Sequence, residues 1–144
     1  QENLANDDLA QARKQGAAWV RAIEEVELEQ RLARDEWERL SRRLARDASA
    51  VTQSKTLEDA RRAFSGATGV LDDILGTFGN VLDESVRKAF CPMAHDDQGD
   101  HWYQRAEEVD NVYFGNQMRR CGEIERVVES GGYVTRSAEA SHGH

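Results

Sequence analysis

The chain has 144 residues, with 19 basic and 27 acidic side chains, which gives a formal net charge of −8. An acidic chain lacks the basic surface that a nucleic-acid binder needs, and no apolar run reaches the roughly 18 residues of a membrane span. A single proline and the absence of long Val/Ile/Thr alternation argue against a β-sandwich or barrel. The composition predicts one soluble, all-α domain.

The sequence begins at Gln1 rather than at a methionine. An exported protein has this appearance once its signal peptide is removed, and a fragment of a longer chain would look the same. We expect a periplasmic or otherwise exported protein.

Apolar or small residues recur every three or four positions from Leu9 to Leu44, with Glu and Arg between them. This spacing places them on one face of a helix. One alternative is a single long helix whose apolar face seeks a second copy. The other is an antiparallel helical hairpin with its turn near Arg34–Asp35 and Asp35 as N-cap. The hairpin suits a compact chain better, because it covers its own apolar face.

Residues 47–56 are small and polar and predict a loop or a frayed helix end. Thr56 then predicts a helix start, because acidic residues follow it in the first turn. That helix extends to the glycines at 76 and 79, and a shorter helix is expected over 81–90.

The expected fold is therefore all-α, an antiparallel bundle of about four helices followed by a Cys/Met loop-and-helix motif. A single helical domain would occupy residues 1–129, with the motif at 91–122. Residues 130–144 are rich in Gly and Ser and predict a flexible tail.

The motif segment contains both cysteines and both methionines of the chain. Pro92 favours an extended Cys91, which would turn the sulfurs of Cys91 and Met93 to one side. Met118 and Cys121 are three apart and would share a helix face. Thiolates and thioethers are soft ligands that select Cu(I), and by the same logic Ag(I). Met93, Met118 and the two cysteines are therefore the candidate metal ligands, and His95 adds an imidazole.

The same segment resembles an uncharacterised bacterial domain that is attached to, or encoded beside, the periplasmic adaptor subunits of copper and silver efflux pumps. The matching residues are Cys91, Pro92, Met93, Ala94, Gly99, Trp102, Asn111, Tyr113, Phe114, Gly115, Met118, Cys121 and Gly122. Val112 departs from the family pattern, which has proline there. The resemblance implies an exported, helix-rich domain that handles a soft metal and has an efflux adaptor as its partner.

Two other functions remain open. Cys91 and Cys121 could form a structural disulfide in an exported protein, and the helices would then serve protein interaction or self-association. Cys91 and His95 could form a nucleophile pair, but no third residue orients the imidazole, and the sequence has none of the usual hydrolase, nucleotide or haem motifs. We therefore expect a binding protein rather than an enzyme.

Overall fold

The computed structural model describes residues 1–26 and 31–134, and these form a mixed α and β fold. The expectation of an all-α bundle is therefore wrong, because the described part of the chain contains a three-stranded antiparallel sheet in the order β2-β1-β3. The elements are α1 (Glu2–Ala5), α2 (Leu9–Glu24), α3 (Arg31–Gln53), α4 (Leu57–Thr77), β1 (Val86–Cys91), α5 (Ala94–Asp97), β2 (Asp100–Gln104), a 3₁₀ turn η1 (Gly115–Gln117) and β3 (Glu123–Val128).

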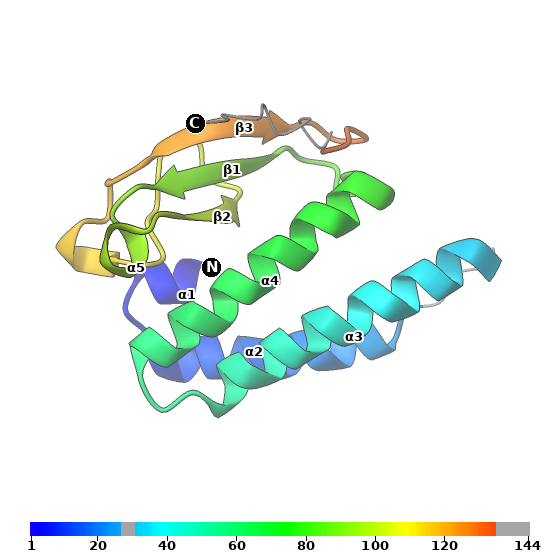
Figure 1. Ribbon diagram of the computed structural model, residues 1–144, viewed down its shortest axis with the longest axis horizontal. Helices are drawn as coiled ribbons and strands as arrows, with labels where there is room; N and C mark the ends of the chain where they lie inside the picture. The colour runs from blue at the N-terminus through cyan, green and yellow to red at the C-terminus, as the bar shows by residue number, and fades with distance from the viewer. Residues whose placement is uncertain (27–30, 135–144) are drawn as a thin grey trace, which may run out of the picture.

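Helices α2 and α3 lie side by side as a hairpin (Figure 1). The hairpin alternative is confirmed, but α2 ends at Glu24 and α3 begins at Arg31, earlier in the chain than expected. Arg34 and Asp35, where the turn was expected, lie inside α3. The apolar face predicted for Leu9–Leu44 packs inside the molecule, since Ala12 and Leu40 on this face are buried. The regular spacing therefore reflects internal packing.

Helix α4 lies between the hairpin and the sheet (Figure 1). It begins where the sequence predicts, because the Thr56 hydroxyl oxygen accepts the backbone N–H of Asp59 over 3.1 Å. Of the loop or helix end expected over 47–56, the structure has the helix end, since α3 continues to Gln53. Its polar residues remain helical because the other face of this stretch is buried, with Ala48 and Val51 in the interior.

The helix expected over 81–90 is replaced by strand β1, which pairs with β2 on one edge and β3 on the other. Asn80 lies between α4 and β1. Its side-chain amide donates to the carbonyl oxygens of Glu84 and Val128, over 2.9 and 3.0 Å. These bonds tie the start of β1 to the end of β3. Pairing with a strand about forty residues away overrides local helix periodicity here.

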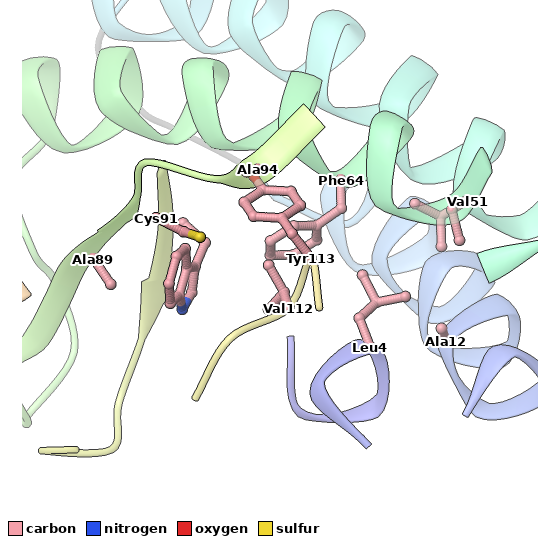
Figure 2. Close-up of a cluster of buried hydrophobic side chains, with 11 residues drawn as sticks. Leu4, Ala12, Val51, Phe64, Ala89, Cys91, Ala94, Val112 and Tyr113 are labelled. Carbon is pink, nitrogen blue, oxygen red and sulfur yellow. The ribbon is translucent and has the colours of Figure 1, made fainter. Parts of the chain in front are cut away.

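The main core joins the sheet to the helices. Figure 2 shows Ala89 and Cys91 on the sheet side, Ala12 and Val51 on the helical side, and Tyr113 and other labelled residues between them. A smaller cluster lies under the far end of the sheet and includes Tyr103, Val128 and Val134. Val134 donates its N–H to Leu75 in α4, and the rest of the expected tail, 135–144, lies outside the described residues.

Candidate metal centre and adjoining cleft

The fold brings the two cysteines together. Cys91 is the last residue of β1 and is fully buried. Cys121 is half-buried, and one residue separates it from β3. Their Sγ atoms are 3.8 Å apart, although the residues are separated by 30 positions. The structure therefore creates a sulfur pair from two distant segments.

Gly122 permits this approach. Its φ is +118°, which disfavours residues with a Cβ, and a Cβ at this position would lie 2.5 Å from the carbonyl oxygen of Phe90. The backbone after Cys121 thus runs directly against the end of β1. Only glycine fits this crossing without displacing the strand.

Asn111 organises the loop that carries Cys121. This buried side chain donates to the carbonyl oxygen of Cys121 over 2.7 Å and accepts the backbone N–H groups of Tyr113 and Phe114 over 2.8 and 3.0 Å. Its own N–H donates to the carbonyl oxygen of Arg119 over 2.8 Å. A single amide side chain therefore satisfies three backbone groups and fixes the path of the chain at Cys121.

The electrostatics of the pair favour the protonated thiol. Burial raises the pKa of Cys121 above its ordinary value, and the hydrogen bond and the charge interaction with Cys91 raise it further. A ligand that needs thiolates must therefore displace protons from this pair.

The two methionines do not have the local geometry that the sequence predicts. Cys91 is extended as expected, since it ends β1, but Met93 lies in a turn with φ −94° and ψ −2°. Its side chain is 42% exposed and lines a surface cleft, while Cys91 is buried. Met118 lies in a turn rather than on an α-helix, and its carbonyl oxygen accepts the N–H of Cys121 over 3.0 Å. Met118 therefore remains beside Cys121 in the chain, and Met93 faces elsewhere.

His95 is held by Asp100 and Tyr113 rather than by a cysteine. Its Nε2 lies 2.8 Å from Oδ2 of Asp100, and its ring meets that of Tyr113 edge-on with centroids 4.9 Å apart. Ser65 on α4 donates its hydroxyl to the same carboxylate oxygen. Within the residues that the structure describes, no hydrogen bond joins Cys91 to His95, so the geometry does not support a Cys–His nucleophile pair.

The backbone at His95 is unusual. His95, Asp96 and Asp97 all have left-handed conformations, with φ of 52°, 56° and 65°. Each such residue costs about 1–2 kcal/mol relative to the right-handed form, and runs of strained residues occur most often at functional sites.

This strained turn forms one wall of a cleft with a volume of about 740 Å³. The first half of α4 also lines this cleft, and so does Tyr113. Arg61 lines the cleft but is already bound, since it donates to Asp7 over 2.6 Å and to the carbonyl oxygens of Leu4 and Val112.

The five expected metal ligands thus divide into two places. Cys91 and Cys121 are paired, with Met118 on the adjoining turn, and Met93 and His95 lie in the cleft. Among residues 1–26 and 31–134, no three or more His, Cys, Asp or Glu side chains are grouped so that they could hold a metal ion.

Sequence reasoning did not identify Asn111 or Asp100 as organising residues. Asn111 had one local signal, an Asn two residues before an aromatic pair in a loop, which is typical of side-chain-to-backbone turns. Asp100 had none, because its partners Ser65 and His95 come from separate elements.

Comparison with known proteins gives one match. A family model described as a protein of unknown function (DUF3347) matches residues 1–83, more than half of the chain. No curated protein and no solved structure matches the chain. The matched part comprises α1 to α4, so the expectation of an uncharacterised helical domain is confirmed for this part. The segment 91–122 lies outside the match, and its association with efflux adaptors stays a prediction.

Proposed function

The chain belongs to the DUF3347 family, and we propose that it is a binding module for a soft monovalent metal ion, Cu(I) or Ag(I), held by the thiolates of Cys91 and Cys121. The observation that carries this proposal is the 3.8 Å separation of the two Sγ atoms.

The separation fits a shared metal ion. A metal–thiolate bond is about 2.3 Å long, so two such bonds to an ion with three or four ligands, which meet at about 110°, place their sulfurs about 3.8 Å apart, whereas a linear two-coordinate ion needs about 4.6 Å. A disulfide needs the sulfurs at about 2.05 Å, which requires the side chains to move together. The observed spacing therefore suits a bridging ion without rearrangement.

The ligand chemistry supports a soft ion. A structural zinc ion takes four protein ligands, whereas the described residues offer no group of three or more His, Cys, Asp or Glu here. Two thiolates joined by a thioether would form a soft ligand set, which selects Cu(I). Met118, on the turn that leads to Cys121, is the residue from which a third sulfur would come.

The cellular setting follows from the resemblance of residues 91–122. This resemblance supports the proposal that the protein is exported and either buffers the ion or passes it to a periplasmic efflux adaptor. In residues 1–26 and 31–134, no helix is long and apolar enough to cross a membrane.

A structural disulfide is the second candidate. Cys91 is fully buried, and the raised pKa of Cys121 disfavours the thiolate. In an oxidising compartment the pair could close into a bridge that stabilises the fold by about 3–4 kcal/mol, given a loop of about 30 residues. The chain would then serve as an interaction domain.

A competition titration distinguishes the two candidates. Reduced wild-type protein and the variants Cys91→Ser, Cys121→Ser and the double variant would compete for Cu(I) with a chromogenic chelator. In proteins that also carry Met93→Leu, which removes the exposed thioether of the cleft, we expect one equivalent bound when both cysteines are present and a loss of at least about 100-fold in affinity in each serine variant, since even outer-shell changes cost 10–100-fold. His101→Asn is the control, because His101 bonds to Glu125 on the sheet, over 2.8 Å. Equal affinities in all proteins would refute the proposal.

A further inference from the structure

We infer that the cleft beside α4 is a second soft-metal site, in which the thioether of Met93 and the imidazole of His95 bind Cu(I) or Ag(I) separately from the cysteine pair. The identity of the ion rests on the proposed function. The assignment of Met93 and His95 as ligands rests only on their positions in the cleft. The site arises because the turn after β1 directs Met93 and His95 into the cleft while Cys91 is buried.

His95 is oriented as metal-binding histidines are. Its Nε2 donates to the Asp100 carboxylate over 2.8 Å, and this bond leaves Nδ1 as the nitrogen with a lone pair. A histidine that donates one ring N–H to a carboxylate and offers the other nitrogen is the usual arrangement at protein metal sites. Within the described part of the chain, no hydrogen bond occupies Nδ1.

The surroundings restrict the imidazole further. Asp100 is itself fixed, because it also accepts the Ser65 hydroxyl and the N–H of His101. The ring also contacts that of Tyr113 edge-on, with centroids 4.9 Å apart. The ring therefore has little rotational freedom, so a ligand pays little additional ordering cost there.

Met93 supplies a reachable soft donor. Its side chain is 42% exposed and lines the same cleft as His95, two residues away on the strained turn. Its exposure beside an oriented imidazole suits a thioether ligand better than a core residue.

The charges around the cleft are compatible with a cation. Asp96 and Asp97 are exposed on the strained turn. The two basic residues of the cleft are already paired, Arg61 with Asp7 and Arg62 with Glu58. An incoming cation therefore meets free carboxylates at the turn.

The two methionines of the chain allow a direct test by NMR. Protein labelled with ¹³C at the methionine methyl groups would show two signals, assigned with Met93→Leu and Met118→Leu. The Cys91→Ser/Cys121→Ser variant, which lacks the cysteine site, would be titrated with silver nitrate. We expect the Met93 methyl signal to shift and saturate near one equivalent, while the Met118 signal moves little.

Variants of the double-serine protein complete the test. His95→Asn should weaken the Ag(I)-dependent shift of the Met93 signal at least tenfold, whereas His101→Asn, the other carboxylate-bound histidine, should leave it unchanged. A Met93 signal that does not shift, or one that shifts equally in the His95→Asn protein, would overturn the inference. Because the cysteines are absent from this protein, the result is independent of whether the cysteine pair binds metal.

Discussion

The side-chain amide of Asn111 donates to the carbonyl oxygen of Cys121 over 2.7 Å, and this bond connects a buried polar side chain to the residue that completes the sulfur pair. Asn111 binds no ligand itself. It positions the turn in which Cys121 faces Cys91.

Replacing Asn111 with alanine should therefore destabilise the protein. The change leaves the N–H groups of Tyr113 and Phe114 and the carbonyl of Cys121 without their partner. The bond to Tyr113 is buried, so its loss costs about 1–3 kcal/mol, and the two half-buried groups add less. We expect a loss of at least about 1 kcal/mol in the free energy of unfolding, measured with urea. Gln117→Ala, at an exposed position in the same loop, should change it by less than about 0.5 kcal/mol. Similar losses in both variants would contradict the role of Asn111.

Gly122→Ala tests the crossing of the chain over β1. The new Cβ would lie 2.5 Å from the carbonyl oxygen of Phe90, at a φ of +118°, so the segment must move away from the strand. We expect a loss of at least about 2 kcal/mol in stability, in the range of backbone strain and overpacking, and slower oxidation of the cysteine pair.

Gly69→Ala is the matched control for this substitution. No atom lies within 4 Å of a Cβ built at this position in α4, and alanine favours a helix over glycine by up to about 1 kcal/mol. This variant should raise the thermal midpoint seen by circular dichroism. An unchanged midpoint in Gly122→Ala would show that the crossing tolerates a side chain.

The reactivity of Cys121 reports on its contact with Cys91. Because burial and then Cys91 raise the pKa of Cys121, the reduced protein holds less thiolate at neutral pH than a free cysteine, and iodoacetamide should modify Cys121 slowly. Cys91→Ala removes the partner, so modification of Cys121 should become several-fold faster when followed by mass spectrometry. An equal or slower rate in Cys91→Ala would contradict this account of the pair.

Alkaline pH should destabilise the protein through Tyr103. Burial, followed by the hydrogen bond to Asp72, raises the pKa of Tyr103 well above its ordinary value. The unfolded chain loses this proton at about pH 10 while the folded protein keeps it, so the stabilising contribution is full below that pH and is lost as pH rises further.

Urea unfolding between neutral pH and pH 11 measures this effect. Stability should fall above about pH 10, and the fall should be shallower in Tyr103→Phe. Tyr133→Phe, at a residue that is 60% exposed, is the control and should retain the wild-type slope. If Tyr103→Phe lost stability with pH as steeply as the wild type, the loss of stability at alkaline pH would arise from other groups.

The sequence allowed the helical part of the fold to be predicted because its signals are local. The 3–4 spacing identified α2 and α3, and Thr56 identified the start of α4 through a bond to a residue three positions away. The turn of the hairpin was misplaced because the periodicity continues through Arg34 and Asp35, which are ordinary positions of α3.

The sheet could not be predicted in this way. Ala89 in β1 pairs with Trp102 and with Ile124, and such contacts between distant residues leave no periodic signal in a six-residue segment. The site was anticipated in part: the cysteines meet as expected, but Met93 and His95 do not join them because a left-handed turn follows β1.

Native mass spectrometry tests the central claim most directly. The protein would be weighed without reductant, and again after reduction and addition of one equivalent of Cu(I). The account predicts that the reduced chain retains one copper ion, and that Cys121→Ser abolishes this retention in protein that also carries Met93→Leu and so lacks the thioether of the cleft. A mass lower by two hydrogens before reduction, with no copper retained afterwards, would contradict it and identify Cys91 and Cys121 as a structural disulfide.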